Sequence, residues 1–73
     1  LFPQEKESAK IAAEMLTERV SIDSMIDGLT ALSRSRFLAH YRKIIEEVAA
    51  DDNEVDKVRF LAKSIIKDLN GKK

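Results

Sequence analysis

The sequence predicts an all-α fold, a compact bundle of four or five short amphipathic helices. Apolar residues recur at spacings of three and four through most of the chain, and no stretch alternates for long enough to indicate a strand. Helix breakers are rare inside this pattern, since the single proline is Pro3 and the two glycines are Gly28 and Gly71. The 73 residues suffice for one domain. Because the chain starts at Leu1 rather than at methionine, we expect this domain, residues 1–73, to belong to a longer protein.

The first two helices are predicted from a proline, a serine and two apolar faces. The first helix is expected over residues 3–19, because Pro3 suits a first turn. Its alanine-rich face, which would let a neighbouring helix approach closely, consists of Ala9, Ala12, Ala13, Met15 and Leu16. Ser21 is expected to cap the second helix, whose apolar face consists of Ile22, Met25, Ile26, Leu29 and Leu32. We assign Gly28 to the opposite face. Glycine weakens a helix, so the second helix is either continuous or broken in two near Gly28.

The third and last helices flank an acidic turn. The third is expected over residues 35–50 after the polar segment 33–36, with an apolar stripe of Phe37, Tyr41, Ile44, Ile45 and Val48. The last is expected to start near Asn53, which forms a capping box with Asp56, and to close at Asn70 and Gly71. Its buried face is expected to contain Val55, Val58, Leu61, Ala62, Ile65, Ile66 and Leu69.

Composition disfavours several classes of function. Thirteen basic residues balance thirteen acidic ones, whereas nucleic-acid-binding domains normally carry a basic excess. The same balance disfavours electrostatic attachment to a membrane, and no apolar run approaches the roughly 18 residues of a membrane span. The chain has no cysteine for disulfides or thiolate-metal sites, and no signal peptide is recognised. We therefore expect an intracellular location, nuclear or cytoplasmic.

No catalytic, metal or cofactor site is predicted. His40 is the single histidine, and no glycine elbow or oxyanion loop accompanies it. The acidic run 51–56 has Val55 at its third alternating position and no glycine, so it reads as a helix-capping turn rather than a calcium loop. No glycine-rich phosphate loop is present. We expect a chain that is not an enzyme and that binds no metal or cofactor.

The candidate partner-binding residues fall in two groups. Phe60 lies about 180° from the centre of the last helix's apolar face, near Lys63 and Lys67. It either packs under another helix or under the N-terminal residues 1–2, or it is an exposed aromatic contact for a partner. The second group, expected in the N-terminal half of the third helix, consists of Arg34, Arg36, Arg42 and Lys43. These side chains either pair with neighbouring helices or form a basic patch for an acidic peptide or a phosphate backbone.

Part of the chain resembles two families of helical domains. The resemblance to the TFIIS N-terminal domain family rests on the segment 60–67, on residues 25–29 and on the stripe Ile44, Ile45 and Val48. The chain departs from this family in two ways. The family's isoleucine-glycine pair is absent, and Leu69 stands where the family has tryptophan. Residues 44–48 and the last helix are also similar to the X domain of paramyxovirus phosphoproteins. Both resemblances imply recognition of a peptide between helices, and the first implies a role in transcription.

The leading hypothesis is therefore a non-enzymatic module that docks a short disordered or helical motif of a protein partner. Two alternatives remain open. One is a nucleic-acid-binding helical domain that uses the same basic residues. The other is a homo-oligomerisation domain in which Phe60 or the alanine face packs against a second copy.

Overall fold

The computed structural model describes residues 3–71 and confirms the all-α fold class. These residues form four α-helices, one 3₁₀ helix and no strand. The elements are α1 (Pro3–Glu18), α2 (Ile22–Ser33), η1 (Leu38–Tyr41, the 3₁₀ helix), α3 (Arg42–Ala50) and α4 (Asp56–Gly71). Within this range, no helix is long and apolar enough to cross a lipid bilayer.

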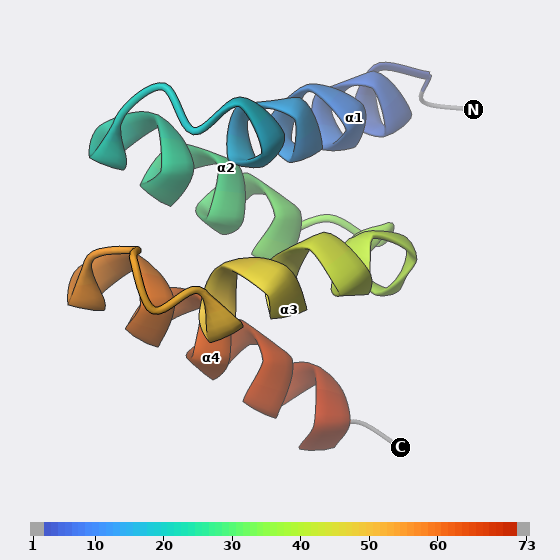
Figure 1. Ribbon diagram of the computed structural model, residues 1–73. Coiled ribbons are helices and arrows are strands. Elements are labelled where there is room, and N and C mark those ends of the chain that lie inside the picture. Colours follow the sequence, from blue (N-terminus) through green and yellow to red (C-terminus); the bar gives the residue numbers. More distant parts are fainter. Residues whose placement is uncertain (1–2, 72–73) are drawn as a thin grey trace.

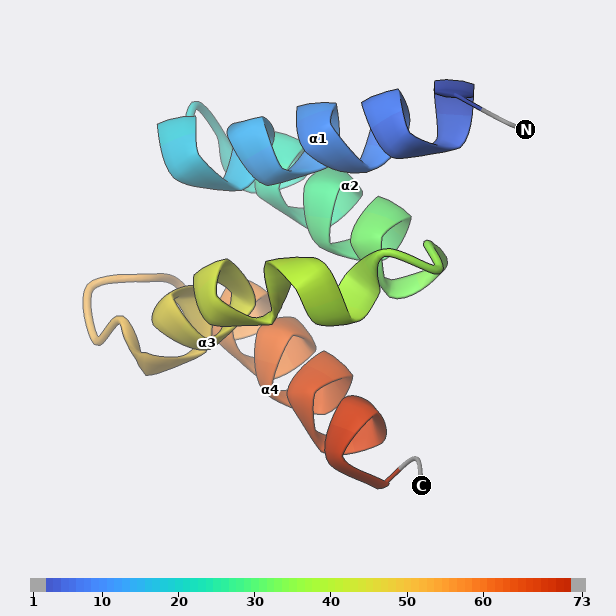
Figure 2. The ribbon, with the colours of Figure 1, turned by 90° about the vertical axis from the view of Figure 1, so that its right-hand side faces the viewer.

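The helices run alternately up and down as two hairpins, α1 with α2 and α3 with α4 (Figure 1). The hairpins pack on each other through α2 on α4 and α1 on α3, so α1 and α4 occupy opposite corners of the bundle. The two views place α1 at one end of the molecule and α4 at the other (Figures 1 and 2). The α1–α2 turn and the α3–α4 turn lie at the same end of the bundle.

The core draws on every α-helix. Its largest fully buried side chains are Leu16, Leu29, Leu32, Ile45, Val48 and Val58. The predicted apolar faces therefore point inward, with two errors at helix starts. Ile22 and Val55 were expected to be buried, yet 45% and 40% of their surfaces are exposed. Ile22 opens α2 and Val55 precedes α4, so neither has a preceding helical turn to cover it.

The predicted place of Gly28 was wrong. Gly28 is buried on the core face of a continuous α2, because it lies three residues after Met25 and four before Leu32. A Cβ atom at this position would lie 2.9 Å from the backbone oxygen of Ala12 and 3.4 Å from Cγ of Leu16. Glycine thus lets α2 approach the backbone of α1, at the alanine-rich face where a close approach was expected.

The third helix starts later than predicted. Residues 34–37 form a turn rather than a helix, η1 follows, and α3 begins only at Arg42. The Ser35 hydroxyl accepts a hydrogen bond from the Phe37 backbone N–H at 3.0 Å, and the Ser35 carbonyl accepts one from Leu38 at 3.2 Å. Serine at this place bonds its local backbone and so competes with helix formation. As a result, Arg34 and Arg36 lie outside α3.

The ends of the other helices agree only in part with prediction. Ser21 caps α2 as expected, since its hydroxyl accepts from the backbone N–H of Ser24 at 3.0 Å. Asn53 is not the cap of α4. Its backbone N–H instead donates to Asp51 Oδ1 at 2.9 Å, which makes a turn two residues before the helix. Gly71 is the last residue of α4 and does not have a positive φ, contrary to the expected glycine beyond the last turn.

We predict that Gly28→Ala lowers the free energy of unfolding by up to about 2 kcal/mol. The new methyl group would displace the backbone of α1, and overpacking of this kind costs about 1–3 kcal/mol. Alanine recovers about 1 kcal/mol of helix propensity, which offsets part of the loss. Urea unfolding monitored by circular dichroism measures the difference.

Gly71→Ala is the matched control, because no atom lies within 4 Å of a Cβ there. It should leave the free energy of unfolding unchanged or slightly raised. Equal stability of the two variants would show that α1 and α2 are not held in close contact at Gly28.

Candidate protein-interaction surface

Phe60 is exposed on the side of α4 that faces away from the core. Its exposed fraction is 60%, and no helix among residues 3–71 covers it. Residues 1–2, which the sequence offered as a cover, lie outside the described residues. Lys57, Lys63 and Lys67 lie on the same side of α4 and are exposed, as spacings of three and four residues require. We call Lys57, Phe60, Lys63 and Lys67 the α4 outer face.

A shallow apolar hollow between α3 and α4 adjoins this face. Its lining residues are Glu46, Ala49, Ala50, Lys63 and Ile66, and we call it the α3–α4 hollow. On the α3 side the hollow is lined by the small side chains of Ala49 and Ala50, and on the α4 side Ile66 is half-buried. At about 100° per residue, Lys63 lies between Phe60 and Ile66 on the helix surface. The aromatic ring and the hollow are therefore parts of one surface, joined at Lys63.

The structure does not bring the predicted basic cluster to this surface. Because α3 and α4 are antiparallel, the start of α3 lies beside the end of α4, away from Phe60 (Figure 1). Arg42 demonstrates this pairing, since its guanidinium donates to Glu46 Oε2 at 2.9 Å and also to Asn70 Oδ1 at the end of α4. Arg42 thus makes an ion pair within α3 and a hydrogen bond to α4.

The other members of the basic cluster have different surroundings. Arg34 is exposed in the turn that ends α2, and the Arg36 guanidinium lies 5.4 Å from the centre of the Phe37 ring. Lys43 lies beside a separate shallow hollow between α1 and α3, which Thr17 and His40 also line. The four side chains therefore differ in their contacts, and Arg34 and Arg36 lie outside α3.

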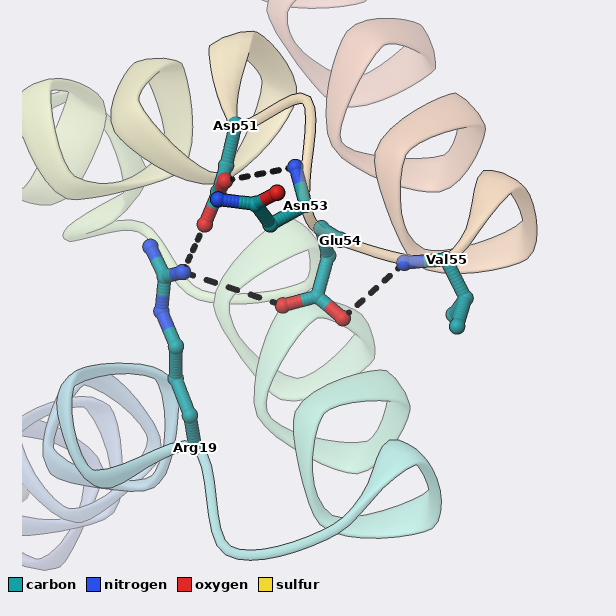
Figure 3. Close-up of polar contacts among 5 residues, drawn as sticks. All are labelled: Arg19, Asp51, Asn53, Glu54 and Val55. Atoms are coloured by element: carbon teal, nitrogen blue, oxygen red, sulfur yellow. Dashed lines mark hydrogen bonds and ion pairs between the residues drawn. The ribbon is translucent and has the colours of Figure 1, made fainter.

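Sequence reasoning missed an ionic bridge between the two hairpins. Arg19 follows the last residue of α1 and has a positive φ of 52°. Its guanidinium donates to Asp51 and lies 3.9 Å from Glu54 Oε2 in the α3–α4 turn (Figure 3). Glu54 Oε1 also accepts from the backbone N–H of Val55 at 3.2 Å. We call Arg19, Asp51 and Glu54 the Arg19 bridge. The predicted topology could have indicated this bridge, because an up-and-down bundle puts its first and third turns at the same end.

Two arginines contact the acidic run 51–56. Besides the Arg19 bridge, Arg59 pairs with Asp56 at 2.6 Å and with Asp52 at 3.7 Å. No cluster of three or more His, Asp or Glu side chains suited to a metal ion occurs among the described residues. His40 is exposed on η1 and meets the Tyr41 ring edge-on, with the ring centres 5.0 Å apart.

Comparison with known proteins adds no relative. No model of a known protein family, no curated protein and no solved structure matches this chain. The surface of the bundle is therefore the basis for assigning a function.

We predict that Asp51→Asn destabilises the protein at neutral pH and has no effect in strong acid. The hydrogen bond from Arg19, followed by that from the Asn53 N–H, lowers the pKa of Asp51 below its ordinary 3.8. A carboxyl group whose pKa is lower in the folded state stabilises the fold above the unfolded pKa. That stabilisation is lost as the pH falls from about 4 through the folded pKa.

Urea unfolding of wild type and variant across this pH range measures the effect. Asparagine at position 51 can still accept the Asn53 hydrogen bond through its amide oxygen, so the variant removes the negative charge and the oxygen that accepts from Arg19. Asp52→Asn is the control, because the Asp52 side chain is 99% exposed and its distance to Arg59 is 3.7 Å. A difference for Asp51→Asn that persists unchanged into strong acid would contradict an ionic role.

Proposed function

We propose that this chain is a non-enzymatic protein-binding module that docks a short helical or disordered segment of a partner on the α4 outer face. The observation that carries the proposal is the 60% exposure of Phe60 among lysines and beside an apolar hollow. Binding hot spots favour aromatic residues, surrounded by groups that exclude water from them. A small domain has few large apolar side chains for its core, so an aromatic residue left outside it points to use by a partner.

The arrangement suits a peptide with one apolar and one acidic feature. An aliphatic side chain of the peptide would enter the α3–α4 hollow against Ile66, and a neighbouring side chain would pack on Phe60. Lys63, between the two, would meet a carboxylate. This is recognition of a segment on a helical surface, with pockets setting which side chains fit.

The sequence resemblances point the same way. The TFIIS N-terminal domain family and the paramyxovirus X domain both imply peptide recognition by a small helical bundle. A role in transcription and an intracellular location, nuclear or cytoplasmic, form part of this proposal on that resemblance.

Binding to nucleic acid is the less favoured function. Neutralising phosphates requires several free cations on one surface. Here Arg42 is engaged by Glu46 and Asn70, Arg36 stacks on Phe37, and the net charge is zero. The lysines of the α4 outer face alone make a narrow basic stripe.

Selection of a displayed random-peptide library on the immobilised chain tests the proposal. We expect enriched peptides that combine an aliphatic or aromatic residue with acidic ones. In an amide-resolved NMR titration, they should shift signals around Phe60, Lys63 and Ile66. Phe60→Ala should weaken their binding by tenfold or more, as loss of a hot spot does.

The matched control is Val20→Ala, which shortens an apolar side chain that is 75% exposed in the α1–α2 turn. This variant should bind the selected peptides as the wild type does. Enriched peptides that bind both variants equally, or a chain that enriches none and binds DNA or RNA instead, would overturn the proposal.

A further inference from the structure

The side of α1 that faces away from the core carries a negative counterpart of the α4 outer face. Glu7, Ile11, Glu14 and Glu18 follow one another at spacings of four, three and four residues, so they form one straight stripe on the helix. All four side chains are exposed, and the exposed fraction of Ile11 is 52%. We call these residues the α1 outer face. The lysines of α1, Lys6 and Lys10, lie to one side of it.

The two faces share one pattern with opposite charge. On α1 an exposed isoleucine lies between Glu7 and Glu14, and on α4 an exposed phenylalanine lies between Lys57 and Lys63. A further like charge follows one turn later on each helix, Glu18 on α1 and Lys67 on α4.

Neither stripe is paired within the part of the chain whose side chains the structure describes. Among residues 6–71, no ion pair involves a residue of either face. Asp56, an acid on the outer side of α4, is held by Arg59 at 2.6 Å. Like charges four residues apart repel, so Glu14 with Glu18 and Lys63 with Lys67 each weaken their own helix. A second chain that supplies the opposite charge would relieve both repulsions.

The two faces cannot meet inside one molecule. They belong to α1 and α4, which lie at opposite ends of the molecule (Figures 1 and 2). Each face is exposed on the side of its helix that lies away from the core. Between two molecules they can meet. Resting on the proposed role of the α4 outer face, we propose that its partner is the α1 outer face of a second copy of this chain, so that copies stack head to tail.

The contact is favourable for either direction of the two helices. With Ile11 against Phe60, glutamates at Glu7 and Glu14 lie on both sides of the isoleucine. Lysines at Lys57 and Lys63 lie on both sides of the phenylalanine, so unlike charges meet whether the helices run parallel or antiparallel. The interface uses two different surfaces of the chain, so it leaves one free face at each end and continues beyond a dimer.

A contact of one helix against another is small, and we expect it to be weak and salt-sensitive. Stable interfaces bury about 1,200–2,000 Å² in total, which is more than a single helix pair provides. Raising the ionic strength from about 0.05 to 0.5 M screens exposed charges and should weaken the association several-fold.

Sedimentation velocity and small-angle scattering of the 73-residue chain over a range of concentrations test the inference. Two variants each disable one face, Ile11→Glu on α1 and Phe60→Glu on α4. Wild type should associate beyond a dimer, and each variant alone should stay monomeric. An equimolar mixture of the two should form a dimer and nothing larger, because it contains one intact face of each kind. Val20→Glu, in the α1–α2 turn, should associate as the wild type does.

Two results would overturn the inference. One is a wild type that stays monomeric at every concentration. The other is an Ile11→Glu variant that still associates while Phe60→Glu does not, which would indicate a symmetric contact between two α4 faces. Neither result touches the peptide selection described above. Peptides that bind through Phe60 to a monomeric chain would leave the proposed function standing and remove only the second copy as the partner.

Discussion

The close approach of α1 and α2 at Gly28 is the constraint on which the rest of the bundle depends. A Cβ atom at Gly28 would lie 2.9 Å from the backbone oxygen of Ala12, which is closer than side chains normally approach a backbone oxygen. Small residues on both helices bring their axes together, so Leu16, Leu29 and Leu32 are fully buried in so short a chain. Small domains bury a modest share of their surface, so close packing of two helices has a large effect on the free energy of unfolding.

The second hairpin is placed on the first by packing and by the Arg19 bridge. Ile45, Val48 and Val58 fill the space between the hairpins, and Arg19 joins the two turns at one end. The inner sides of the helices are buried in these contacts, and each of α1 and α4 has one long side outside the core. The outer sides are where the sequence is free to carry charge and exposed apolar groups.

The zero net charge hides a separation of charge along the molecule. Composition alone disfavoured nucleic-acid binding and electrostatic attachment to a membrane, because thirteen basic residues balance thirteen acidic ones. The fold nevertheless puts glutamates on the outer side of α1 and lysines on the outer side of α4. A balanced chain can therefore have two surfaces of opposite sign, and each can attract a partner that the total charge does not suggest.

Most of the fold could be predicted from the sequence, because helical periodicity and helix breakers are local signals. Ser21 is such a signal, and it caps α2 as predicted. The predictions failed where a distant residue or a competing local hydrogen bond determines the structure. Ser35 draws the backbone into a turn ahead of α3, and Gly28 is explained by a contact with α1.

Part of the candidate surface could also be predicted from the sequence. The position of Phe60 opposite the core of α4 followed from helix geometry, and its exposure agrees with that position. The different surroundings of Arg34, Arg36, Arg42 and Lys43 did not follow from the sequence, because they depend on where α3 begins and on the antiparallel arrangement of α3 and α4. The α3–α4 hollow and the Arg19 bridge likewise exist only once the hairpins have packed.

The proposed binding role requires that Phe60 lie outside the core. The free energy of unfolding of Phe60→Ala, compared with that of the wild type by urea unfolding, measures whether it does. We expect a change within about 0.5 kcal/mol, as for an exposed side chain. A loss of about 3–5 kcal/mol, as for a phenylalanine truncated inside a core, would show instead that Phe60 belongs to the packing of the fold.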